Sequence, residues 1–110
     1  REITCSTITD AIKKMCIEAA TILPQDVEKA LSQKHDEEDS ALAQKTLQVL
    51  MDNAKLAQEK QMPICQDTGM AFVYVTMGQE VHITGGSLNE AIQEGVRQGY
   101  IRGVFKKISC

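Results

Sequence analysis

The sequence has few aromatic residues and no long apolar run. It contains no Trp, and Phe and Tyr together account for 4% of 110 residues, so its core has to be built from aliphatic side chains and Met. Its longest uninterrupted apolar stretch is a handful of residues, far short of the roughly 20 that cross a bilayer. No charged and then apolar leader opens the chain. We therefore expect neither a membrane span nor a membrane partner.

The sequence also lacks a concentration of charge of one sign. Lys and Arg number 12 against 15 Asp and Glu, which gives a formal charge of −3, and the two signs are interspersed. A nucleic-acid partner is therefore not expected. Apolar residues at 43% and charged residues at 25% are typical of a folded globular chain. This length has room for one ordinary core, or for a piece of a larger domain.

The four cysteines form no closely spaced pair. Cys5, Cys16, Cys65 and Cys110 are widely separated, and without a secretory leader reduced thiols in the cytoplasm are the better interpretation. Cys16 falls among apolar residues at helical spacing, so we expect it to serve packing. Cys5 and Cys110 receive no role.

Apolar residues at three- and four-residue spacing predict a first helix with one buried face. Thr7 or Thr9 is its expected N-cap, and Pro24 ends it and suits the first turn of a second helix that runs to about Gln33. The apolar face of the first helix comprises Ile8, Ile12, Met15, Cys16, Ala19, Ala20 and Leu23.

A polar break at residues 35–39 separates the second helix from a third, and His35 is expected to be solvated within this break. Asp39 or Ser40 caps the third helix, which runs to about Glu59. Its apolar stripe comprises Leu42, Leu47, Leu50, Met51, Ala54, Leu56 and Ala57.

Residues 70–77, MAFVYVTM, are rich in β-branched and aromatic side chains and predict a strand. A turn at Gly78 and Gln79 leads to residues 80–84, which alternate between polar and apolar, so a β-hairpin is expected. His82 lies on that hairpin, where alternation makes a solvent-facing position as plausible as a functional one.

A last helix is predicted to start at Ser87 and to run toward Phe105, with Ser87 and Glu90 forming a capping box. Each glycine in a helix interior costs about 1 kcal/mol relative to Ala, so three on one face indicate close approach of another backbone. These glycines are Gly95, Gly99 and Gly103. The predicted fold class is α+β, with three N-terminal helices, a β-hairpin and a C-terminal helix.

The loop at residues 62–69 holds the reactive side chains. From the residues alone, Cys65 could be an iron or zinc ligand beside substrate-binding polar groups. Equally, the loop could be a Pro-initiated turn in which Asp67 and Thr68 satisfy backbone donors and Cys65 is a small buried residue. Both interpretations stay open at this point.

Three segments resemble one enzyme family. Residues 63–71 (PICQDTGMA), 78–83 (GQEVHI) and 91–100 (AIQEGVRQGY) resemble the iron-sulfur (class I) fumarate hydratases and L-tartrate dehydratases. The helical order also resembles the start of their alpha subunit or N-terminal region, so the likeness covers essentially the whole chain. The resemblance implies that residues 1–110 are the N-terminal portion of an iron-sulfur hydro-lyase catalytic domain, truncated at its C-terminus.

That resemblance implies reversible hydration of a dicarboxylate: fumarate to L-malate in the tricarboxylic acid cycle, or dehydration of L-tartrate to oxaloacetate. Cys65 would be one of three protein ligands of a [4Fe-4S] cluster, which leaves one iron open as a Lewis acid. The other two ligands would follow Cys110. Gln66 would bind a substrate carboxylate, and Asp67 would bind the hydroxyl and take part in proton transfer, its alternative being a turn cap.

The resemblance also implies a basic group near the end of the last helix, where many relatives read Leu-Arg-Lys-Ser. Lys106 takes the arginine position here, so a point charge replaces a two-pronged fork that would hold a carboxylate more firmly. The catalytic His of the family matches neither His35 nor His82.

The implied partners are the small dicarboxylate and either the rest of a catalytic chain or a second, beta subunit in a homo- or hetero-oligomer. The 110 residues alone would be inactive. Two alternatives remain: a noncatalytic α+β module that docks through the glycine face of its last helix, and a thiol enzyme that uses Cys65 with His82 as base.

Overall fold

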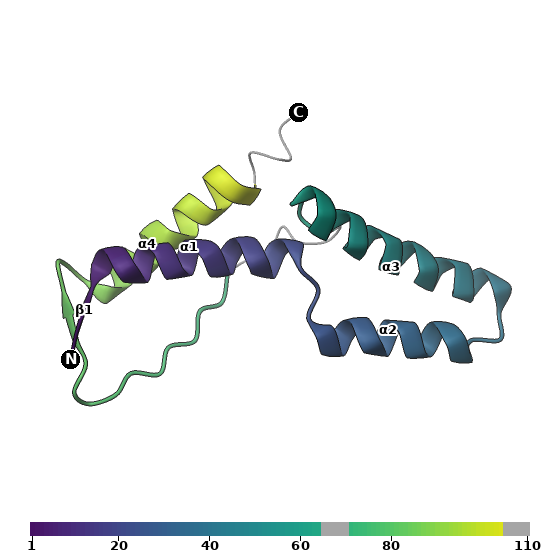
Figure 1. The fold of residues 1–110 in the computed structure, drawn as a ribbon, viewed down its shortest axis with the longest axis horizontal. Coiled ribbons are helices and arrows are strands. Elements are labelled where there is room, and N and C mark those ends of the chain that lie inside the picture. Colours follow the sequence, from purple (N-terminus) through teal and green to yellow (C-terminus); the bar gives the residue numbers. More distant parts are fainter. Residues whose placement is uncertain (65–70, 105–110) are drawn as a thin grey trace. The chain divides into compact units, whose positions relative to one another are not determined.

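A computed structural model describes residues 1–64 and 71–104, the last three by their backbone alone. Contacts divide the chain into two compact units, residues 1–18 with 68–110 and residues 19–67. Helices dominate both units, and a short two-stranded sheet makes the class α+β, as predicted (Figure 1).

The sheet of the first unit is parallel. Strand β1 (Glu2–Thr4) pairs with β2 (His82–Thr84), with Ile3 opposite Ile83. The ladder continues at Arg1, whose carbonyl accepts a hydrogen bond from the His82 N–H at 2.8 Å.

The predicted β-hairpin is therefore wrong. The turn forms, because the Val81 N–H donates to the Gly78 carbonyl at 3.2 Å, but residues 71–78 are assigned to no strand. The reason is that β2 pairs with the N-terminal β1, a neighbour about 80 residues away that local alternation cannot reveal.

Helix α1 (Cys5–Thr21) follows β1 directly. Its first turn is capped by Thr4, whose Oγ1 accepts a hydrogen bond from the Thr7 N–H at 3.4 Å, so the predicted caps Thr7 and Thr9 are wrong. Thr7 and Thr9 both lie inside the helix, because α1 begins directly after the last residue of β1, with no loop between them. Thr9 has another function there: its Oγ1 donates to the Ala91 carbonyl at 2.9 Å and ties α1 to α4.

Helix α4 (Leu88–Gln98) begins after Ser87, as predicted, but the Ser87 side chain makes no cap hydrogen bond, so the predicted capping box does not form. The helix packs on α1 through Gly95 and through Gly99, the residue that follows its last turn. A Cβ on Gly95 would come within 2.6 Å of the Ile12 Cβ, and one on Gly99 within 2.9 Å of the Cys16 Cβ. The predicted close approach is confirmed for these two glycines. A π-helix, η1 (Gly99–Val104), replaces the expected last α-helical turns.

The second unit contains a pair of packed helices, α2 (Gln25–Glu37) and α3 (Ala41–Lys60). Ser40 caps α3 as predicted, with its Oγ accepting from the Ala43 N–H at 3.3 Å. Helix α2 runs through residues 35–37, so that part of the predicted polar break is wrong. Its last turn is supported by Gln33, whose side chain donates to the Glu37 carboxylate at 3.0 Å.

The cores of both units are small. Ile12 and Ala91 are buried in the first unit, and Ala20, Thr21 and Ala57 in the second. Ala57 is the only buried member of the predicted α3 stripe among the described residues, and Leu42 is 77% exposed. Helices described by the structure include none with both the length and the apolar character needed to cross a membrane.

Candidate functional site

The predicted site residues Cys65, Gln66, Asp67 and Lys106 lie outside the described residues. The structure describes the polypeptide on either side of the first three. Its geometry shows how the chain is held immediately before Cys65 and what surrounds it after residue 70.

Helix α3 ends one turn before Cys65 with a left-handed residue. Gln61 has φ 54° and ψ 42°, and its N–H and that of Met62 both donate to the Ala57 carbonyl, the latter at 2.9 Å. This arrangement satisfies a carbonyl that the helix end would otherwise leave unpaired. Pro63 has no N–H to donate and cannot continue a helix. The chain therefore leaves α3 in a defined direction.

The residue just before Cys65 is hydrogen-bonded to the end of α1. The Ile64 N–H donates to the Ala20 carbonyl at 2.8 Å. Ala20 lies in the last turn of α1, where carbonyls have no partner within the helix, and it is 1% exposed. Sequence reasoning missed this anchor, because an alanine in a helix gives no sign that its carbonyl binds a distant backbone.

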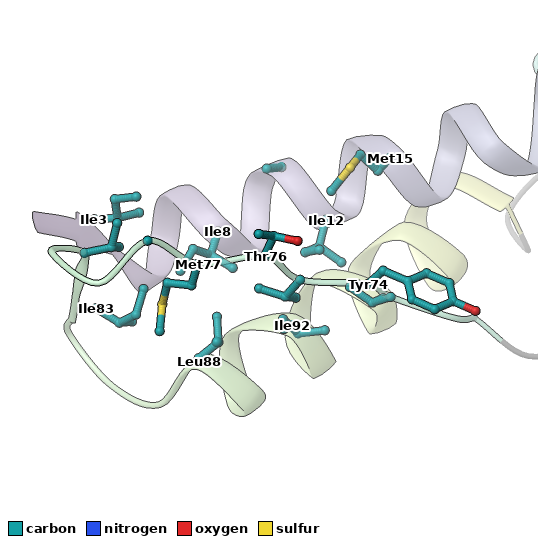
Figure 2. Close-up of a pocket in the computed structure, with 15 residues that line it drawn as sticks. Ile3, Ile8, Ile12, Met15, Tyr74, Thr76, Met77, Ile83, Leu88 and Ile92 are labelled. Carbon is teal, nitrogen blue, oxygen red and sulfur yellow. The ribbon is translucent and has the colours of Figure 1, made fainter. Parts of the chain in front are cut away.

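After residue 70 the chain borders an apolar groove of about 320 Å³ between residues 73–78 and the helices α1 and α4 (Figure 2). Its lining includes Ile8, Ile12, Val75, Ile83, Leu88 and Ile92. Among the described residues that line it, none is charged. A dicarboxylate would lose hydration against this described lining without gaining a cation from it.

The two described cysteines are separate thiols. Cys5 Sγ donates to the Ser87 carbonyl at 3.7 Å, whereas Cys16 is half-buried beside Gly99, and burial raises the pKa of its thiol. They are 11 positions apart in one helix, a separation of about 16 Å at 1.5 Å per residue. The Cys16 environment agrees with the predicted packing role. Within residues 1–64 and 71–104, no group of three or more His, Cys, Asp or Glu could hold a metal ion.

The two histidines lie in different surroundings. His82 is exposed on β2, in agreement with a solvent-facing position. His35 is helical and half-buried, so its predicted place in a solvated loop is wrong; its Nδ1 lies 3.3 Å from an Asp36 carboxylate oxygen. A pairing of His82 with Cys65 involves a residue that the structure does not describe.

The glycine face of α4 is occupied within the chain. Gly95 and Gly99 are buried against α1, so the predicted docking of a partner on these two residues is wrong. The backbone that the glycine spacing predicted belongs to the first helix of the same chain.

Comparison with known proteins gives a consistent result. The family model described as fumarate hydratase (Fumerase) matches residues 9–110. The chain is 36% identical over 92 residues to a putative L(+)-tartrate dehydratase subunit alpha of Methanocaldococcus jannaschii, covering 83% of this chain and 32% of that protein. It is 30% identical over 96 residues to a putative fumarate hydratase class I of Geobacillus stearothermophilus, covering 84% of this chain and 19% of that protein. It is 26% identical over 99 residues to the L(+)-tartrate dehydratase subunit alpha of Escherichia coli K12, covering 90% and 32% respectively. The chain thus spans a third or less of the length of these relatives.

Proposed function

The chain belongs to the fumarate hydratase (Fumerase) family, and from this premise we propose that it is the N-terminal portion of a hydro-lyase catalytic domain. The complete enzyme would add water to a dicarboxylate or remove it, with fumarate and L-malate, or L-tartrate and oxaloacetate, as the pair. The names of the relatives include both activities, which supports the reaction type.

The proposed cofactor is a [4Fe-4S] cluster with Cys65 as one ligand. A single thiol in a loop of amide and carboxylate side chains fits one corner of a cluster better than a structural zinc site, which takes four protein ligands. The Ile64 anchor supports this assignment, because it holds the backbone directly before the ligand. Cys16 is half-buried, and its Cβ lies against Gly99, which supports a packing role for this residue instead. The two remaining ligands would follow Cys110. When bound, the cluster supplies an open iron that acts as a Lewis acid on a hydroxyl oxygen.

The side chains after Cys65 have complementary chemistry for a hydroxylated diacid. The Gln66 amide can donate its N–H to a substrate carboxylate. The Asp67 carboxylate can accept a hydrogen bond from the substrate hydroxyl or from water and can receive a proton. An ionised Asp beside a dianion is otherwise repulsive, so its role depends on that hydroxyl contact.

Lys106 is proposed as a cation for the second substrate carboxylate. Its ammonium group supplies charge without the two-pronged geometry of arginine. The remaining partners would be the rest of the catalytic chain or a beta subunit, in an oligomer, because two relatives are named as alpha subunits. A cytoplasmic location would keep the ligating thiols reduced.

The observation that carries the proposal is the sequence PICQDTG at residues 63–69, inside the stretch that matches the family. The test is anaerobic reconstitution of the complete gene product with iron and sulfide, comparing Cys65→Ala with the matched control Cys16→Ala. We expect Cys65→Ala to lose visible cluster absorption, bound iron and turnover of fumarate or L-tartrate, whereas the control retains all three. If Cys65→Ala keeps its iron and its rate, the ligand assignment is wrong. We expect residues 1–110 alone to show neither a stable cluster nor turnover.

A further inference from the structure

Residues 71–77 have the composition of a strand but no strand partner among the described residues. Their sequence, AFVYVTM, combines β-branched and aromatic residues. They are extended in Figure 1, and within the described part of the chain they make no backbone hydrogen bond. Backbone N–H and C=O groups of folded proteins are nearly all paired, with protein or with water. This segment therefore presents seven residues of backbone for which residues 1–64 and 71–104 provide no backbone partner.

The aromatic side chains of the segment are more exposed than its two valines and Met77. Val73, Val75 and Met77 are 37%, 51% and 52% exposed, and all three line the groove against α1 and α4, as do Tyr74 and Thr76. Phe72 and Tyr74 are 72% and 93% exposed. Figure 2 shows the Tyr74 ring extending away from Ile8, Ile83 and Leu88, with Met77 on their side. The aromatic side chains Phe72 and Tyr74 thus lie mostly in solvent, although Tyr74 also borders the groove.

The sheet formed by β1 and β2 provides neither a hydrogen-bonding strand for residues 71–77 nor a layer that covers their side chains. Strands β1 and β2 have three residues each and, in the part of the chain that the structure describes, pair only with one another. A sheet of this size is marginal in water, and stable sheets need further strands or a covered apolar face. An exposed apolar strand edge also invites pairing with another chain.

We propose that residues 71–77 are a strand of a larger sheet whose hydrogen-bonding neighbour is a β-strand from the same protein, outside residues 1–110. The occupant has to be a strand, because only extended backbone can pair with a run of N–H and C=O groups on one edge. The relatives are long enough to supply it, since this chain covers 32% and 19% of two of them.

A second copy of the chain fits less well. Pairing residues 71–77 edge to edge with their own copy leaves Phe72 and Tyr74 of both copies in solvent. A larger part of the same protein can supply both a neighbouring strand, which pairs with the backbone in the sheet, and a further layer, which covers Phe72 and Tyr74. The inference does not depend on the proposed reaction, and none of its tests measures activity.

The first test is hydrogen–deuterium exchange of the complete gene product, followed in peptides that contain residues 71–77, at two protein concentrations about a hundredfold apart. We expect exchange at least about a hundredfold slower than for unstructured peptide, equal at both concentrations. Exchange at the unstructured rate would overturn the proposal. Protection that disappears on dilution would also overturn it, because the neighbour would then be a second copy.

The second test compares Tyr74→Lys with the control Gln79→Lys, which changes an exposed residue of the adjacent turn. A covered aromatic face predicts that Tyr74→Lys accelerates exchange in residues 71–77 at least tenfold while the control leaves it unchanged. Equal exchange in both variants would show that this face is open to solvent and would overturn the assignment.

Discussion

Gly95 in α4 lies against Ile12 in α1 so closely that a Cβ on residue 95 would stand 2.6 Å from the Ile12 Cβ. The same atom would lie 2.8 Å from the Thr9 carbonyl oxygen. The Thr9 carbonyl belongs to the helix backbone, and the Ile12 Cβ is bonded directly to it. Neither atom can therefore move aside unless the whole helix moves. The contact sets how closely the two helices of the first unit approach.

Gly95→Ala should destabilise the protein. Replacing glycine inside a helix gains about 1 kcal/mol in propensity, whereas overpacking a tight contact costs about 1–3 kcal/mol. Because contacts below 3.0 Å require α1 and α4 to separate, we expect the clash to prevail by about 1 kcal/mol and the melting temperature of the complete gene product to fall. Gly78→Ala is the control, since its Cβ would meet nothing closer than 3.9 Å. Equal melting temperatures for Gly95→Ala and the wild type would contradict the packing described.

The anchor before Cys65 gives a second prediction. Ile64→Pro removes the N–H that donates to the Ala20 carbonyl, and a buried acceptor without a partner costs about 1–3 kcal/mol. We expect lower stability in urea and, if Cys65 holds a cluster, less iron per protein after reconstitution. Ile64→Val keeps the N–H and should retain the iron. Iron contents that do not differ between the two variants would show that the anchor does not support the ligand.

Burial of Cys16 predicts a pH dependence. Because burial raises the pKa of this thiol above its value in the unfolded chain, the folded state binds its proton more tightly. Its contribution to stability is complete below the ordinary thiol pKa and is lost as pH rises through the higher folded value. Alkylation of Cys16, followed by mass spectrometry as a function of pH, should reach half its maximal rate at higher pH in native protein than in urea. Coincident profiles would contradict the effect of burial.

The helices could be predicted from sequence better than the sheet. Ser40 and Ser87 mark helix starts by local chemistry, and both starts are where the sequence predicts them. The partner of β2 lies near residue 3, and no local pattern contains that information, so alternation alone predicted a hairpin. Thr4 was missed as a cap because it is also the last strand residue.

In the candidate site, too, some features can be predicted from local sequence and others cannot. The residue types at positions 65–67 are visible in the sequence, and the family model matches the stretch that contains them. The hydrogen bonds that hold the chain before Cys65 are not visible in the sequence, because their acceptors are the backbone carbonyls of Ala20 and Ala57. Any side chain would leave those carbonyls in place, so composition and spacing carry no record of the anchor.

Lys106 provides the last prediction, which concerns substrate binding by the complete enzyme. If its ammonium group neutralises a substrate carboxylate, Lys106→Ala removes a charged hydrogen bond worth about 1.5–3 kcal/mol and raises KM at least about tenfold. Lys106→Arg restores the charge and adds a second donor toward the same carboxylate, so its KM should equal or fall below that of the wild type. Lys107→Ala is the matched control, because it removes the same charge one position along the chain. If both alanine variants raise KM equally, the effect is one of general electrostatics, and Lys106 does not contact the substrate.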